Sequence, residues 1–233
     1  AVALLAQGAV QSISYKHVLP NYGVFDEKRV FEEGGVSAPV VFEGVSLGVM
    51  ICEDFWFPEI PSQLRSQGAD MLIAINASPF NLGKPDERLA QARARVSETG
   101  LPLICVNQVG GQDELVFDGA SFALAADGLE IARLPAFHEN IQKQTWTFSA
   151  EGSSSCDNQS LAPELSELAS VYAAMMLGLK DYVEKNGFEG VIIGLSGGID
   201  SALTAAVAVD ALGAERVRCV MMPSQYTSSD SLE

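Results

Sequence analysis

Short apolar runs alternate with stretches of mixed polarity through the first half of the chain. The apolar runs at residues 45–52, 69–77 and 101–109 are rich in valine, isoleucine and leucine, which is typical of buried strands. The stretches between them, at residues 58–67 and 85–99, carry the composition and end signals of helices. Strands and helices in this alternation predict a layered α/β protein.

Two hairpins are predicted outside this alternation. Asp127-Gly128 is a strong turn signal between the β-rich runs at residues 116–125 and 129–134. A second pair of apolar runs flanks Gln7-Gly8 within residues 1–16. Because this hairpin places the first residues inside a sheet, we expect sequence to be missing upstream.

A change of composition divides the chain. Residues 142–159 are polar and rich in serine, which favours a linker. We therefore predict a first domain at residues 1–141, a linker at 142–160 and a second domain at 161–233.

The second domain opens on a long helical pattern over residues 162–186, with Gly187 as a stop. A strand at 190–195, a helix at 201–212 and a strand at 217–222 follow, which together make one βαβ unit. Apolar residues recur along the long helix at steps of three and four, and we expect this face to be core. The face consists of Leu165, Leu168, Tyr172, Met175, Leu179 and Val183.

Composition and charge narrow the class of protein. Hydrophobic residues make up 48% and charged residues 19% of the 233 residues, which is typical of a globular chain. The net charge of −16 argues against nucleic acid as a partner. No run of about 18 apolar residues predicts a membrane span. The four scattered cysteines and two histidines disfavour a zinc site or a disulfide scaffold, and they suit the reducing cytoplasm.

A glycine-rich turn joins the first strand of the βαβ unit to its helix. Its sequence is Gly-Leu-Ser-Gly-Gly-Ile-Asp-Ser, at residues 194–201. Glycines let a ligand approach the backbone closely, and the free amides at a helix start favour an anion. A carboxylate such as Asp200 is unusual in a phosphate cradle unless a metal ion or a ligand hydroxyl needs it. A tight turn that only allows packing is the alternative.

This turn resembles the pyrophosphate loop of the ATP pyrophosphatase family, whose members cleave ATP between the α- and β-phosphates and adenylate a substrate. It is not a Walker motif, because no Gly-Lys-Ser/Thr follows it. Residues 220–224, with Tyr226 and Thr227, are similar to the segment that follows the loop in NAD synthetases. The resemblance implies that Asp200 holds Mg²⁺. It implies ATP binding by Gly194, Leu195, Ser196, Gly197, Gly198, Ile199, Asp200, Ser201 and Met222.

Cys52 ends the first apolar run, in the sequence Ile-Cys-Glu-Asp-Phe-Trp. A thiol at a strand end and beside cations can be activated as a nucleophile. An inert buried cysteine is the alternative, and it is the usual fate of an unpaired cysteine. A Cys-His pair has no support from the sequence, and His17 and His138 are interpreted as structural or exposed.

The neighbouring segments favour the catalytic interpretation. Residues 16–29 resemble the catalytic-lysine segment of the nitrilase superfamily, in the form found in glutamine-dependent NAD synthetases. Cys52 with Glu53 resembles the nucleophile segment, and residues 107–114 and 117–119 continue the match. The implied fold is a nitrilase-like α-β-β-α sandwich, incomplete at its N-terminus, followed by the start of a Rossmann-like parallel-sheet ATP pyrophosphatase domain. The implied partners are small molecules, namely glutamine, deamido-NAD and ATP, together with further copies in a homo-oligomer.

The same resemblance implies roles for individual residues. Cys52 attacks the side-chain amide of glutamine, while the Lys16 ammonium stabilises the oxyanion and favours the thiolate. A thioester forms, ammonia leaves for the adenylated deamido-NAD, and water releases glutamate. Glu27 matches a further glutamate of the site. The glutamine-binding positions are Tyr22, Glu53, Ser78 and Lys84, where a solvated surface lysine is the alternative for the last.

Two departures qualify the match. The general-base glutamate of the superfamily lies upstream of its lysine, whereas no Asp or Glu precedes Lys16. The second domain also stops after one βαβ unit. We therefore expect a central fragment that lacks synthetase activity and has little glutaminase activity by itself. Two other functions stay open: an amidase with a degenerate ATP domain, which would not bind ATP, and a non-catalytic scaffold.

Overall fold

The computed structural model describes residues 1–149, 152–157 and 159–223. Its main body is a seven-stranded sheet with the strand order β13-β10-β9-β6-β5-β4-β3. The central neighbours β4, β5 and β6 are parallel, whereas β3 pairs antiparallel with β4, β9 with β6, and β10 with β9. The strands are β3 (Val40–Phe42), β4 (Val45–Ile51), β5 (Met71–Asn76), β6 (Leu103–Asn107), β9 (Phe122–Leu124), β10 (Glu130–Arg133) and β13 (Ser160–Leu161).

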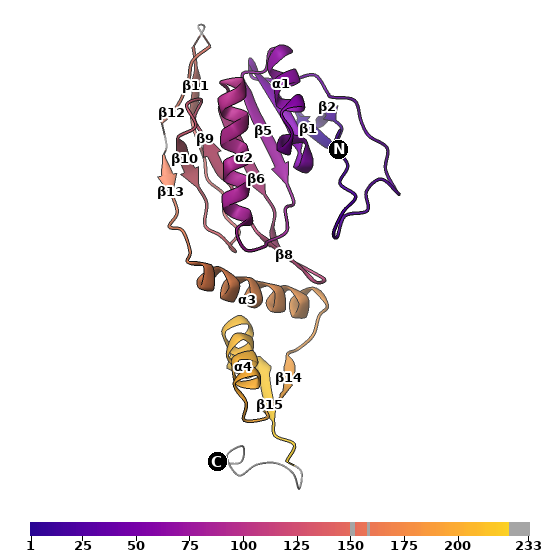
Figure 1. Ribbon diagram of the computed structural model, residues 1–233, viewed down its shortest axis with the longest axis vertical. Coiled ribbons are helices and arrows are strands. Elements are labelled where there is room, and N and C mark those ends of the chain that lie inside the picture. The colour runs from indigo at the N-terminus through magenta and orange to yellow at the C-terminus, as the bar shows by residue number, and fades with distance from the viewer. Residues whose placement is uncertain (150–151, 158, 224–233) are drawn as a thin grey trace.

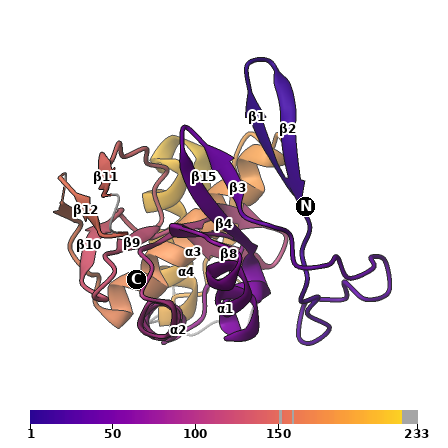
Figure 2. The same cartoon turned by 90° about the horizontal axis from the view of Figure 1, so that it is seen from above.

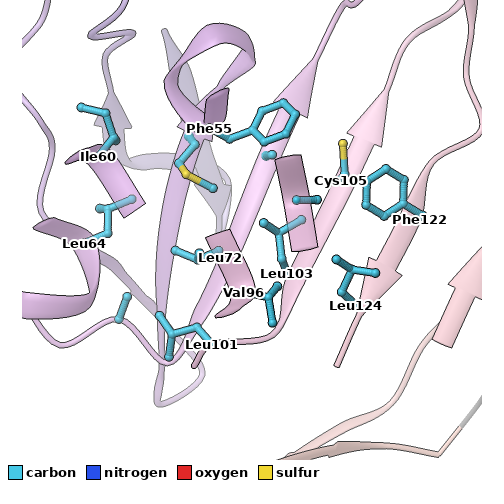
Figure 3. Packing of buried hydrophobic residues seen from close by; sticks show 14 residues of the cluster. Phe55, Ile60, Leu64, Leu72, Val96, Leu101, Leu103, Cys105, Phe122 and Leu124 are labelled. Carbon is cyan, nitrogen blue, oxygen red and sulfur yellow. The ribbon is translucent and has the colours of Figure 1, made fainter. Parts of the chain in front are cut away.

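Two helices cover one face of this sheet, as Figures 1 and 2 show. They are α1 (Glu59–Ser66) and α2 (Lys84–Thr99). Successive side chains of a strand point to opposite faces, so Leu72 and Ala74 of β5 are fully buried while Ile75 is 38% exposed. Figure 3 shows the resulting core, in which Phe55, Leu64 and Val96 pack onto the sheet. The core therefore lies on the side of the sheet that the helices cover.

The strands and helices predicted in this part are confirmed, with two differences at strand ends. The apolar run at 101–109 leaves the sheet after Asn107, because the Gln108 amide bonds Asn76 and the chain turns into β7 (Val109–Gln112). The run predicted at 116–125 is divided by Gly119 and Ala120, which both have positive φ. Its first part is β8 (Leu115–Asp118), which pairs with β7 instead of the main sheet.

Both predicted hairpins are present. β1 (Val2–Ala6) and β2 (Ala9–Ser14) are antiparallel about Gln7-Gly8, and both turn residues have positive φ. Figure 2 shows this hairpin projecting away from the helices. The Asp127-Gly128 turn joins β9 to β10.

The segment predicted as a linker contains regular structure. β11 (Trp146–Phe148) and β12 (Ser154–Cys156) form an antiparallel hairpin. β13 then pairs in parallel with β10 at the edge of the main sheet. The polar composition gave no sign of these strands, because polar side chains do not prevent the backbone from joining a sheet edge.

The long helix, α3 (Glu167–Lys185), begins later than predicted. Ala162 still bonds Arg133 of β10, and Ser166 caps the helix by accepting a hydrogen bond from the Ala169 amide. The expectation that one face of α3 is core was wrong for much of its length. Val183 is buried, but Leu168 is 83% and Met175 40% exposed. Leu165 is 44% exposed as well.

Beyond α3 lies the predicted βαβ unit (Figure 1). β14 (Val191–Gly194) and β15 (Val217–Val220) are parallel, and α4 (Ile199–Leu212) connects them through the short 3-10 helix Ala214–Arg216. α4 starts two residues before the predicted helix, so Ile199 and Asp200 belong to its first turn. Ser224, Tyr226 and Thr227 lie outside the described residues.

Across the described ranges, no helix is both long enough and apolar enough to cross a membrane.

Candidate active site

Cys52 follows the last residue of β4 and opens a five-residue 3-10 helix, Cys52–Trp56. Its φ is 50°, a left-handed conformation that is uncommon for a residue other than glycine. Because parallel strands β4, β5 and β6 end at the same edge, Cys52 lies level with the ends of the next two strands. The Ala77 backbone amide, just beyond β5, bonds its thiol. The predicted nucleophile therefore lies at the carboxyl edge of a parallel sheet.

The Lys16 ammonium lowers the pKa of this thiol. Its side chain is 13% exposed, and its ammonium donates to both carboxylate oxygens of Glu27, at 2.6 and 2.8 Å. Charge-assisted pairs of this kind hold both partners in a defined geometry. The structure thus brings together Cys52, Lys16 and Glu27.

Opposing effects act on the pKa of Cys52. Burial raises the pKa of the Cys52 thiol above its ordinary value, and this effect is larger than the opposing effects of the Lys16 ammonium and the Ala77 amide. Glu53 and Glu27 raise the pKa further. Burial and the two carboxylates therefore oppose the thiolate form that the Lys16 ammonium favours.

The predicted glutamine-binding residues lie around the 3-10 helix that begins at Cys52. The Tyr22 hydroxyl donates to Glu53 Oε1 at 2.8 Å, and burial together with this bond raises the pKa of Tyr22. The Lys84 ammonium lies 3.9 Å from the centroid of the Trp56 ring and 3.0 Å from Glu87. Lys84 is thus held beside the turn by a cation–π contact.

Ser78 belongs to a buried polar network that the sequence did not indicate. Its amide donates to Asn107 Oδ1 at 3.1 Å, and the Asn107 amide group donates to Asp118 at 3.1 Å. Arg88 forms a two-bond pair with Asp118, at 2.6 and 3.2 Å, and both side chains are 2% exposed. This network joins the ends of β5 and β6 to α2 and to the base of the β7–β8 hairpin.

The glycine-rich turn is closed by its own hydroxyl groups. Ser201 Oγ lies 3.1 Å from Ser196 Oγ, accepts from the Ser196 amide at 3.2 Å and donates to the Gly198 carbonyl at 2.9 Å. Gly197 has φ 77°, which favours glycine. The turn and the amide end of α4 are exposed, so a ligand can reach them.

Two further predicted residues flank this turn. A Cβ added at Gly194 would meet the Met222 side chain at 3.1 Å, so Met222 lies against the start of the turn. Asp200 is exposed in the first turn of α4. In the part of the chain that the structure describes, no group of three or more His, Cys, Asp or Glu side chains is arranged for a metal ion. Mg²⁺ can bind at a single carboxylate when the phosphates of a substrate supply further ligands. Asp200 fits Mg²⁺ only in this way.

Comparison with known proteins finds two family models along the chain. The carbon-nitrogen hydrolase family model matches residues 1–150, and the NAD synthase model matches residues 171–233. A glutamine-dependent NAD(+) synthetase from Rhodobacter capsulatus is 47% identical over 99% of this chain and 42% of its own length. The chain therefore spans less than half the length of this curated relative.

Solved structures show the same fold. A glutamine-dependent NAD+ synthetase from Acinetobacter baumannii, in complex with ADP, matches with a TM-score of 0.91 and 43% identity, over 99% of this chain and 43% of that one. A carbon-nitrogen hydrolase from Helicobacter pylori matches with a TM-score of 0.52 and 29% identity, over 57% of this chain and 51% of that one.

The chain belongs to the carbon-nitrogen hydrolase family. The second family model and the relatives extend the match across the βαβ unit, and over its whole length the chain is similar to glutamine-dependent NAD synthetases. The predicted fold, a nitrilase-like domain followed by the start of a NAD synthetase domain, is confirmed.

Proposed function

We propose that this chain carries the cysteine glutaminase site and the ATP-phosphate turn of an enzyme that amidates deamido-NAD to NAD. The observation that supports this most is the pairing, in one chain, of Cys52 beside Lys16 with an open glycine-rich turn before a helix. The division into residues 1–141, 142–160 and 161–233 is part of the proposal.

In the glutaminase step, Cys52 attacks the side-chain amide carbon of glutamine. The Lys16 ammonium stabilises the oxyanion that develops on the carbonyl oxygen. Ammonia leaves as the thioester forms, and water then releases glutamate and restores the thiol. Glu27 holds the ammonium of Lys16 in place through its two hydrogen bonds.

Glutamine is an amino acid, so its backbone end carries one charge of each sign. Lys84 is placed to pair with its carboxylate, and Glu53, with Tyr22 bonded to it, suits its ammonium group. Ser78 lies next to Ala77, whose amide bonds the nucleophile. These four residues form the proposed glutamine site.

In the synthetase step, the amides and hydroxyls of residues 194–201 bind the phosphates of ATP. Asp200 together with those phosphates would hold Mg²⁺, which neutralises phosphate charge when bound. Deamido-NAD is adenylated with release of pyrophosphate, and ammonia displaces AMP to give NAD. Internal transfer of ammonia between the sites and a homo-oligomeric assembly are further parts of this proposal.

The test is NAD formation by the gene product from deamido-NAD and ATP, with glutamine or with ammonium as nitrogen source. Cys52→Ala is expected to lose glutamine use and to retain ammonium use, because it removes only the nucleophile. Ammonia formation from glutamine without ATP binding would instead favour the amidase alternative. Loss of neither activity in Cys52→Ala would contradict the role of this cysteine.

A further inference from the structure

Lys16 lies on a segment without regular structure. Residues 15–39, between β2 and β3, contain neither helix nor strand. The backbone around Lys16 is bonded to the same segment: the Gly34 amide donates to the Lys16 carbonyl at 2.9 Å, and the Tyr15 amide donates to Ser37 at 3.2 Å. These bonds shape the segment, but they do not fix it relative to the sheet that carries Cys52.

Asp54 supplies that connection. Its Oδ1 accepts from the amides of His17 at 3.0 Å and Val18 at 2.7 Å, directly after Lys16. Its Oδ2 accepts from the amide of Ile51 at 3.0 Å, directly before Cys52. One carboxylate therefore binds the backbone beside both reacting groups.

The surroundings make this arrangement rigid. Asp54 is 2% exposed, and a buried carboxylate is tolerated where hydrogen bonds replace its water. Its three bonds to amides are charge-assisted and stronger than neutral ones. Val18 and Val36 add apolar contacts with the core, but such contacts are not directional.

We propose that Asp54 is a positioning residue of the glutaminase site, which fixes the Lys16 backbone relative to Cys52. The proposal rests on the glutaminase function proposed above. Asp54 does not touch the glutamine amide; it acts through the placement of Lys16. A displacement of about 1 Å in such a group costs roughly 100-fold in rate.

Asp54→Asn tests this proposal in the gene product, because an amide offers one acceptor oxygen where the carboxylate offers two. Its NH₂ group then faces backbone N–H donors on one side, so either the Lys16 side or the Cys52 side is released. We expect glutamine kcat to fall roughly 10- to 100-fold with a smaller change in KM, while ammonium-dependent NAD formation is retained.

The matched control is Asp70→Asn. Asp70 also accepts a backbone bond from β4, from the Ser46 amide at 2.8 Å, but at the opposite end of that strand from Cys52. Asp70 is exposed. Asp70→Asn is expected to leave the kcat of the glutamine-dependent reaction unchanged. Equal losses in both variants would indicate a general effect on β4 and would overturn the proposal.

A second readout reports the position of Lys16 without glutamine turnover. The rate of Cys52 alkylation by iodoacetamide is followed against pH, and Asp54→Asn should move its midpoint upward, toward that of Lys16→Met. Because both act through the same cation, adding Asp54→Asn to Lys16→Met should produce no further shift. An unshifted midpoint in folded Asp54→Asn, or fully additive shifts, would overturn the proposal.

These measurements also distinguish a failure of the proposed glutaminase function from a failure of the proposed role of Asp54. If the unsubstituted protein forms no ammonia from glutamine, the proposed function fails, whereas the alkylation profile still decides the role of Asp54. If Asp54→Asn does not fold, amide hydrogen exchange of the unsubstituted protein decides. Slow exchange of the His17 and Val18 amides together with Ile51 is expected, and exchange as fast as in an open loop would count against the bond.

Discussion

Cys52 combines a strained backbone with a side chain whose pKa is raised by burial. At φ 50° it occupies a conformation that persists only where neighbouring contacts fix it, and such positions often belong to active sites. The contacts here are the Asp54 bond to Ile51 before it and the Ala77 amide at its sulfur. The sheet edge and the turn therefore position the thiol, while burial opposes its ionisation.

Lys16→Met should raise the pKa of Cys52 further. The Lys16 ammonium lowers this pKa against the effect of burial, so its removal leaves less thiolate at any given pH. Alkylation of Cys52 should therefore become slower below its midpoint, and the midpoint should move to higher pH. Peptide mapping after iodoacetamide treatment over a pH series measures this at Cys52 and separates it from the exposed Cys219.

Lys28→Met is the control for that experiment. Lys28 lies on the same irregular segment, but its side chain is 57% exposed and its ammonium pairs with Glu33 at 3.6 Å. Its removal should leave the Cys52 profile unchanged. A shift of the alkylation midpoint to lower pH in Lys16→Met, or equal shifts of the midpoint in both variants, would show that Lys16 does not act on the thiol as a nearby cation.

At the scale of elements, α3 is attached to the first domain through the β7–β8 hairpin. Asp181 of α3 accepts from the Gly111 amide at 2.6 Å, and Lys185 bonds both Asp181, at 3.0 Å, and the Gly111 carbonyl. The helix comes close because both sides lack side chains: a Cβ at Gly111 would lie 3.0 Å from Gly178 Cα. The hairpin starts beside Asn107 and Asp118, so this contact is continuous with the buried network near Ser78.

Gly111→Ala should loosen this attachment. The added methyl meets helix backbone, which cannot move aside as a flexible side chain does, so overpacking is expected to cost about 1–3 kcal/mol of stability. Urea unfolding measures this loss. Gly35→Ala is the control, since nothing lies within 4 Å of a Cβ there, and it should change stability by less than about 0.5 kcal/mol. An equal effect in both variants would refute the close contact.

The sequence indicated most elements because their signals are local. The Asp127-Gly128 turn and the apolar runs of β4, β5 and β6 each predict one structure from neighbouring residues alone. The pairing of β8 with β7, and the exposure of Leu168 and Met175, depend on distant segments that no local period encodes. The same holds in the site: the position of Cys52 was predictable, whereas its φ and the Asp54 bonds to His17 and Val18 require the folded chain.

At the scale of the whole molecule, the two candidate sites lie on different sheets, with α3 between them (Figure 1). The proposed glutaminase residues surround the carboxyl edge of the main sheet, and the glycine-rich turn follows β14. If the sites perform separate steps, a change confined to one should leave the other step intact. Cys52→Ala changes the first site alone, so the complementary experiment is a substitution in the glycine-rich turn alone.

Gly197→Val is that change, because a β-branched residue is strained at φ 77° and its side chain would crowd the closed turn. NAD formation should be lost with glutamine and with ammonium alike, while hydrolysis of glutamine persists. Gly128→Val introduces similar strain, at φ 83°, in a hairpin of the first domain, and it should retain both steps. Unchanged NAD formation and ATP affinity in Gly197→Val would remove the turn from the synthetase step. Loss of both steps in Gly197→Val alone would mean that glutamine hydrolysis depends on this turn as well.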